Sequence, residues 1–130
     1  MSIDNLNLTS DPAVQYGPAL SCDIPAVSEE EFDETIRRAI KTYGKESRTQ
    51  MLFEEMAELQ DALCKLARGR DTRSHVCEEI ADVLIMCLQM AQIYGPKAVE
   101  NWINIKINRL KNRLDNPQFI NKPDGNDQNS

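Results

Sequence analysis

The stretch that decides the fold is FEEMAELQDALCKLARGRDTRSHVCEEIADVL, residues 53–84. It holds two acidic motifs, Glu-Glu-Met-Ala-Glu at 54–58 and Glu-Glu-Ile-Ala-Asp at 78–82. In each motif two carboxylates stand three residues apart, Glu55 with Glu58 and Glu79 with Asp82. Positions i and i+3 are neighbours on an α-helix, so each pair would point two carboxylates at one spot.

The segment between the two motifs, RGRDT at 68–72, carries a turn signal. It allows two helices to fold back antiparallel and to bring both carboxylate pairs together. Four converging carboxylates repel one another strongly unless a cation lies among them. Oxygen ligands favour hard cations, so we expect Mg²⁺, with Mn²⁺ as the alternative, before zinc or iron.

The whole pattern predicts an all-α protein with a core of about four helices and no strand. A capping box at 28–31 starts the first helix, and Gly44 is placed to end it. The second helix is expected to begin near Ser47 or Thr49 and to run to Arg68. The third should begin within 71–74 and end at Tyr94, and the fourth should run from Pro96 to just before Pro117.

Apolar stripes predict which helix faces form the core. On the second helix the stripe consists of Leu52, Met56, Leu59, Leu63 and Leu66. The third helix is apolar nearly all round from 83 to 91, which predicts a helix buried on most sides. On the fourth helix the core stripe is Ile103, Ile107, Leu110 and Leu114.

The predicted organisation is one helical domain at 28–116 between two irregular flanks. Residues 1–27 are punctuated by proline and glycine and predict an extended arm or disorder. Residues 117–130 are polar and rich in Asn, Asp and Pro, which is typical of a loose tail.

Composition excludes several classes of protein. The net charge of −6 argues against a nucleic-acid binder, and no segment predicts a signal peptide or a membrane span. The four cysteines have no C-x-x-C spacing. We therefore interpret them as reduced thiols and expect a cytoplasmic protein.

A basic stripe follows the acidic motifs on the fourth helix. It runs beside the core stripe at the same spacings and consists of Trp102, Lys106, Arg109 and Arg113. Such a stripe would lie at the rim of the bundle, where it could face the carboxylates or an anion held by the metal.

The acidic motifs have three other interpretations besides a Mg²⁺ site: a di-iron bundle, a zinc site and a solvated acidic face. A di-iron bundle needs Glu-x-x-His motifs, and the single histidine, His75, is not three residues after any Glu. His75 with Cys77 and Cys64 fits no structural zinc spacing, so we expect an exposed histidine and two packed thiols. A solvated acidic face is the ordinary explanation of one such pair, but here the pattern occurs twice, on consecutive helices.

These residues resemble a known family. Glu-Glu-x-x-Glu followed some twenty residues later by Glu-x-x-Asp, in a small helical chain, is similar to the MazG-like nucleotide pyrophosphohydrolases of the all-α NTP pyrophosphatase superfamily. The segments YGKES, FEEMAELQDAL, EEIADVLIMCLQM and KINRLKNRL carry the likeness, which covers about residues 32–114.

The resemblance implies Mg²⁺-dependent hydrolysis of a nucleoside triphosphate to a monophosphate and pyrophosphate. It implies that the metal ligands are Glu55, Glu58, Glu79 and Asp82. Glu54 matches the first glutamate of the family motif, and we assign it with Glu55 to catalysis.

The resemblance also implies that Lys106 and Arg109 face the phosphates, and we add Trp102 and Arg113 of the same stripe as candidates for substrate binding. Many similar proteins carry Gln at the position of Arg48, which we keep as a further candidate for contact with base or phosphate.

The sequence therefore predicts a nucleoside triphosphate pyrophosphohydrolase that forms a homo-oligomer, a dimer or a tetramer, because one chain gives a thin core. A narrower dUTPase-like or dCTPase-like activity is the alternative among enzymes. A helical oligomer that binds a cation only for stability is the alternative among non-enzymes.

Overall fold

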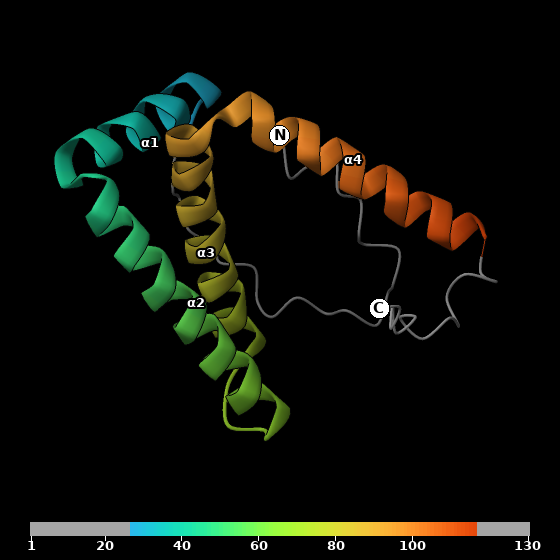
Figure 1. Cartoon of the computed structure of the whole chain (residues 1–130). Helices are drawn as coiled ribbons and strands as arrows, with labels where there is room; N and C mark the ends of the chain where they lie inside the picture. Colours follow the sequence, from blue (N-terminus) through green and yellow to red (C-terminus); the bar gives the residue numbers. More distant parts are fainter. Residues whose placement is uncertain (1–26, 117–130) are drawn as a thin grey trace, which may run out of the picture. The chain divides into compact units, whose positions relative to one another are not determined.

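The computed structural model describes residues 27–116, which form four α-helices and no strand (Figure 1). The helices are α1 (Glu29–Tyr43), α2 (Lys45–Ala67), α3 (Arg73–Tyr94) and α4 (Pro96–Asp115). The predicted all-α fold is confirmed. Apart from Val27, the predicted arm and tail lie outside the described residues. The chain forms two compact units, which meet between Met90 and Ala91. Within 27–116, no helix is long and apolar enough to cross a membrane.

The start of α1 follows the predicted capping box. The Ser28 hydroxyl accepts a hydrogen bond from the backbone N–H of Glu31 at 3.2 Å. In return, the Ser28 backbone N–H donates to the Glu31 carboxylate at 3.0 Å. These bonds satisfy groups that every helix start leaves without an intrahelical partner.

Gly44 ends α1 and also starts α2. Its φ of 81° lies in the region that side chains disfavour, and its N–H donates to the Ile40 carbonyl at 2.9 Å. The chain thus turns from one helix into the next on a single residue. For this reason α2 begins at Lys45, earlier than the expected Ser47 or Thr49.

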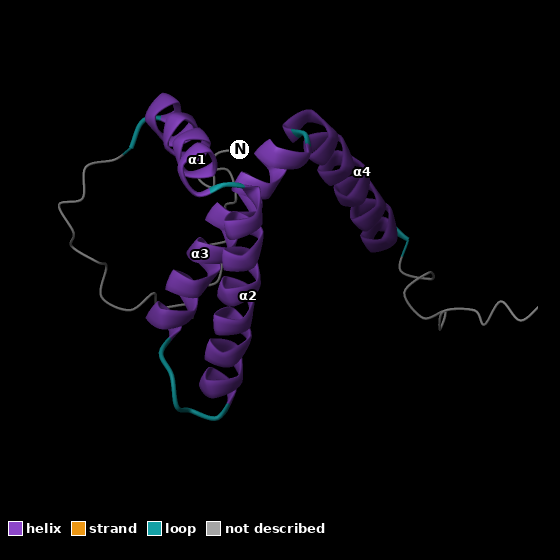
Figure 2. Ribbon diagram, turned by 60° about the vertical axis from the view of Figure 1, so that its left-hand side comes forward, coloured by secondary structure: helices purple, strands orange, loops and turns teal. Residues whose placement is uncertain are grey.

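The turn between α2 and α3 has the bonding pattern of a Schellman motif. Gly69, at φ 68°, donates its N–H to the Leu66 carbonyl, and Arg70 donates to the Lys65 carbonyl, both at 2.9 Å. On the far side, the Thr72 hydroxyl accepts from the His75 backbone N–H and begins α3. The two helices consequently run antiparallel and side by side (Figure 2).

The core of the first unit is small and differs in part from the predicted stripe. Ala62 is its most enclosed apolar residue at 1% exposure, and Leu59 is half-buried. Met56 and Leu63, which were expected in the core, are 43% and 47% exposed. The buried face of α2 carries Leu59 and Ala62 together with the half-buried Glu55. Met56 and Leu63 are each one residue further along the helix than Glu55 and Ala62, which turns them away from this face.

Helix α3 is apolar on two opposite faces, and only one of them is covered. Val76 and Met86 are buried on the face toward α2. The opposite face is 40–46% exposed and consists of Ile80, Leu84, Ile85 and Leu88. The prediction of a helix buried on most sides is therefore wrong for the single chain, because α2 shields one side.

Helix α4 has no buried residue. Its expected core stripe is 38–65% exposed, from Ile103 at the low end to Leu114 at the high end. The prediction of a buried stripe is wrong here, because the described part of this unit contains only α4 and the last turn of α3.

Candidate metal centre

Three of the predicted ligands meet in the first unit. Glu55 and Glu58 of α2 and Glu79 of α3 each bring one carboxylate oxygen within 4.8 Å of the others. Their surroundings differ: Glu79 is 7% exposed, Glu55 is half-buried, and Glu58 is exposed. The antiparallel hairpin thus brings the two motifs together, as their spacing predicts.

Asp82, the fourth predicted ligand, is half-buried on α3 but is not among the three residues whose carboxylate oxygens lie within 4.8 Å of one another. Burial is the largest cause that raises the pKa of Glu55 above its ordinary value of 4.5. The charge of Asp82 is the next cause, followed by Glu58, Glu79 and then Glu54. Glu54 itself is exposed. Burial and the acidic neighbours therefore disfavour the ionised form of Glu55, and a bound cation would relieve the repulsion.

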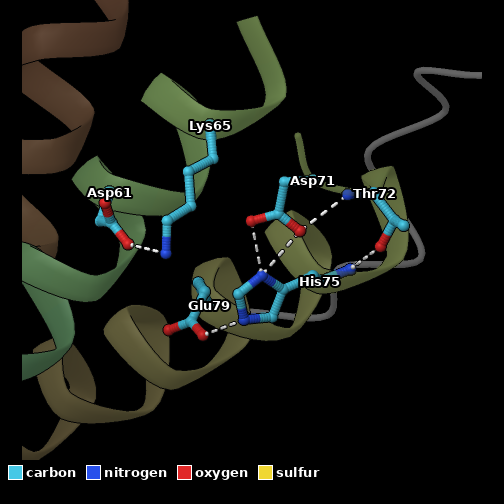
Figure 3. Close-up of polar contacts among 6 residues, drawn as sticks. All are labelled: Asp61, Lys65, Asp71, Thr72, His75 and Glu79. Atoms are coloured by element: carbon cyan, nitrogen blue, oxygen red, sulfur yellow. Dashed lines mark hydrogen bonds and ion pairs between the residues drawn. The ribbon is translucent and has the colours of Figure 1, made fainter. Parts of the chain in front are cut away.

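A histidine joins the cluster to the start of α3 (Figure 3). The His75 Nδ1 lies 2.9 and 2.8 Å from the two carboxylate oxygens of Asp71. Its Nε2 lies 2.9 Å from Oε1 of Glu79. The bond to Asp71 is the main cause that raises the pKa of His75, and the same bond lowers the pKa of Asp71. With a carboxylate beside each nitrogen, the ring is favoured as the imidazolium, hydrogen-bonded to Asp71 through Nδ1 and ion-paired with Glu79 through Nε2.

A hollow of about 380 Å³ opens beside the cluster. It is lined by Ala57, Glu58, Asp61, His75 and Glu79. The carboxylate of Asp61 is paired with Lys65, as Figure 3 shows, so it is already neutralised. The hollow therefore has room for a ligand next to Glu58 and Glu79, the two lining glutamates that Lys65 does not neutralise.

The residues present fit a hard divalent cation. Oε2 of Glu79 is buried and has no hydrogen-bond partner. A buried carboxylate oxygen without a partner costs free energy unless a proton donor or a metal satisfies it. All the convergent donors are carboxylate oxygens, which suit Mg²⁺ or Mn²⁺ better than zinc.

The candidates for substrate binding lie apart from this cluster in the sequence. Arg48, near the start of α2, is half-buried, and its guanidinium lies 4.3 Å from the centre of the Tyr43 ring. The stripe of Trp102, Lys106, Arg109 and Arg113 is exposed along α4, in the second unit.

Sequence reasoning missed His75 and Asp71. It expected an exposed histidine without a role, but the ring is held between two carboxylates. Part of the signal was a spacing of four, since His75 and Glu79 are neighbours on one face of α3, while Asp71 lies in the turn before this helix. The expectation of packed thiols is also wrong, because Cys64 and Cys77 are both exposed.

A family model of the MazG nucleotide pyrophosphohydrolase domain matches residues 43–115, which lie inside the predicted helical domain. The match takes in both acidic motifs and the basic stripe. Searches of curated proteins and of solved structures found no match.

Proposed function

The chain belongs to the MazG nucleotide pyrophosphohydrolase family, and on this premise we propose that it hydrolyses nucleoside triphosphates to monophosphates and pyrophosphate with Mg²⁺ or Mn²⁺. The observation that carries the proposal is the convergence of Glu55, Glu58 and Glu79 within 4.8 Å, with one buried oxygen of Glu79 lacking a partner. With Asp82, these residues would hold the cation.

The cation, when bound, would neutralise phosphate oxygens and lower the pKa of a water molecule. The side chains of the protein would position the cation and the attacking water and would supply charge. Glu55, whose pKa is raised, would bind a cation or a proton more readily than an ordinary glutamate. Glu54, next to it and exposed, would accept a proton from the attacking water or orient it.

The basic stripe on α4 supports the binding of a triphosphate. Lys106, Arg109 and Arg113 are exposed cations, and arginine pairs with phosphate oxygens through two parallel hydrogen bonds. Trp102, 57% exposed, offers an aromatic face beside them. We assign the three cations to the phosphates and Trp102 to stacking.

Two polar residues of the first unit, Arg48 and Gln89, have buried side-chain atoms and support a binding site for the nucleobase. Arg48 lies seven residues before Glu55, and Gln89 lies seven residues after Asp82. Two helical turns are about 10 Å, and the helices are antiparallel, so both residues lie at the same distance along the hairpin. Thr49 and Met90, in contact at 3.8 Å, confirm this register. Nε of Arg48 and Oε1 of Gln89 are buried and have no hydrogen-bond partner among the described residues, so each would gain from a polar group such as that of a nucleobase.

The open face of α3 supports a homo-oligomer, a dimer or a tetramer. Four large apolar residues on one face of a helix are costly to leave in water, and a second copy of the chain would cover them. The free thiols of Cys64, Cys77 and Cys87 agree with a cytoplasmic protein.

The test is pyrophosphate release from a panel of dNTPs and NTPs, each with Mg²⁺ and with EDTA. We expect release with Mg²⁺ only. Release from dUTP or dCTP alone would select the narrower activity. If no nucleotide is hydrolysed although Mg²⁺ raises the melting temperature, the cluster is a structural cation site and the proposed function is wrong.

A further inference from the structure

We propose that His75 is a positioning residue for the metal centre, holding the carboxylate of Glu79 by one oxygen so that the other stays free for a cation. The inference rests on the proposed function, because it takes Glu79 as a metal ligand. It goes beyond it by giving a role to a residue outside both acidic motifs.

The two oxygens of Glu79 are in different situations. Oε1 lies 2.9 Å from Nε2 of His75, whereas Oε2 is buried and has no partner. A glutamate side chain has three rotatable bonds, so a carboxylate fixed at one oxygen loses most of its freedom to turn. The ion pair with His75 therefore restricts the orientation of the Glu79 carboxylate, one oxygen of which lies with those of Glu55 and Glu58.

His75 is itself held in place. Asp71 accepts from its Nδ1 at 2.8–2.9 Å, and the side chain of Asp71 is only 11% exposed. Asp71 in turn accepts from the backbone N–H of Thr72 at 2.7 Å, and Thr72 caps α3. A chain of bonds thus runs from the helix start to the metal ligand, and partners of this kind orient ligands in metal sites.

Positioning and simple electrostatics predict opposite results. An imidazolium next to the cluster repels a divalent cation, so its removal should tighten metal binding if charge alone mattered. If His75 holds Glu79 in place, its removal should weaken metal binding. The sign of the change therefore separates the two.

The experiment measures Mn²⁺ binding to the full chain without nucleotide, by the electron paramagnetic resonance signal of free Mn²⁺. We expect His75→Ala to weaken binding about tenfold or more, the loss typical of such partners. His75→Gln keeps an N–H that reaches Glu79 and should restore most of the affinity. Asp71→Asn keeps the acceptor for Thr72 but loosens the ring, so it should weaken binding by a smaller factor.

Lys65→Gln is the matched control, because it removes a cation beside the same hollow without touching Glu79. It should leave Mn²⁺ affinity unchanged or slightly tighter. Circular dichroism in EDTA checks that each variant is folded, and if His75→Ala unfolds, the comparison of His75→Gln and Asp71→Asn with wild type decides.

Wild-type or tighter affinity in a folded His75→Ala overturns the proposal, as does a wild-type chain that binds no Mn²⁺. Failure of the proposed function looks different. In that case wild type binds Mn²⁺ and His75→Ala binds it more weakly, but no nucleotide is hydrolysed.

Discussion

At the scale of single residues, the carboxylates of the cluster differ in what they would cost to lose. Glu58 is exposed and has no ion pair with any cation within residues 27–116, whereas Glu79 is buried and ion-paired with His75. Neutralising Glu58 therefore removes repulsion without stranding a partner. Neutralising Glu79 removes the charge that faces the His75 imidazolium, which keeps only a weaker, neutral acceptor on that side.

We predict that Glu58→Gln and Glu79→Gln each lower kcat/KM by about 100-fold or more, since each would remove a proposed metal ligand. In EDTA, Glu58→Gln should keep or raise the melting temperature, and Glu79→Gln should lower it. Pyrophosphate release and thermal melts in EDTA check both parts. Wild-type turnover in either variant would remove that residue from the metal centre.

The raised pKa of Glu55 predicts how stability depends on pH without metal. Because the pKa is above 4.5 in the folded state, this carboxyl favours folding below pH 4.5, and the contribution is lost as the pH rises through the folded pKa. Glu55→Gln should therefore melt higher than wild type at pH 7–8 in EDTA, and the difference should shrink toward pH 4.5. A difference that does not change with pH would contradict the crowding of the four carboxylates.

His75 also shows what limited prediction of the site. The i, i+3 pairs were readable, because a helix alone makes Glu55 and Glu58 neighbours. The role of His75 depends on the conformation of the α2–α3 turn, which places the carboxylate of Asp71 against Nδ1 of the ring. A search for metal ligands at known spacings does not find a residue such as His75, which contacts a metal-binding side chain and not the metal itself.

At the scale of helices, the boundaries were readable because local chemistry sets them. Ser28 starts α1 with its side chain and backbone, Gly69 ends α2 through its backbone N–H, and Pro96 stands in the first turn of α4, where its missing N–H costs nothing. The buried faces were less readable. An apolar stripe shows which residues avoid water, but it does not show which neighbour covers them, as the exposure of Met56 and Leu63 demonstrates.

Helix α4 carries the prediction that concerns phosphate. Lys106→Ala and Arg109→Ala should each lower kcat/KM by about tenfold or more, mainly through KM, because each would remove a proposed charge-assisted hydrogen bond to phosphate. Both residues are exposed, so the melting temperature should stay within about a degree or two of wild type.

The control on the same helix is Lys97→Ala. Lys97 is paired with Glu100 at 2.9 Å in the exposed first turn, and its removal should leave the kinetics unchanged. Should Lys106→Ala and Arg109→Ala both keep the wild-type KM, the phosphate contacts lie on another element.

At the scale of the whole molecule, the described residues leave more large apolar side chains exposed than they bury. Among the described residues only Ile36, Ala62, Val76 and Met86 form a buried apolar core, and the face of α3 opposite α2 is open. The thin core was predictable from chain length, but the identity of the open faces was not, since it depends on where each helix packs.

We predict that Leu84→Glu lowers the mass of the particle in solution from that of an oligomer to that of the single chain. A charge on the open face of α3 would be costly to bury between two copies. Sedimentation velocity at several protein concentrations measures this. Val27→Glu, at an exposed apolar position before α1, is the control and should leave the mass unchanged. An oligomer that persists in Leu84→Glu would move the interface to another face.

The turn closed by Gly69 has a consequence for the order of events in folding. All four carboxylates come from one hairpin, residues 45–94, so their meeting closes a short loop at low entropic cost. Contacts this local form early, before two chains can find each other. We therefore expect the cation to bind while the chain is still single. Refolding followed by stopped flow should show a phase that Mg²⁺ accelerates and protein concentration does not change, followed by a slower phase whose rate rises with concentration. If Mg²⁺ affects only the slower phase, the cluster is completed by assembly rather than by the hairpin.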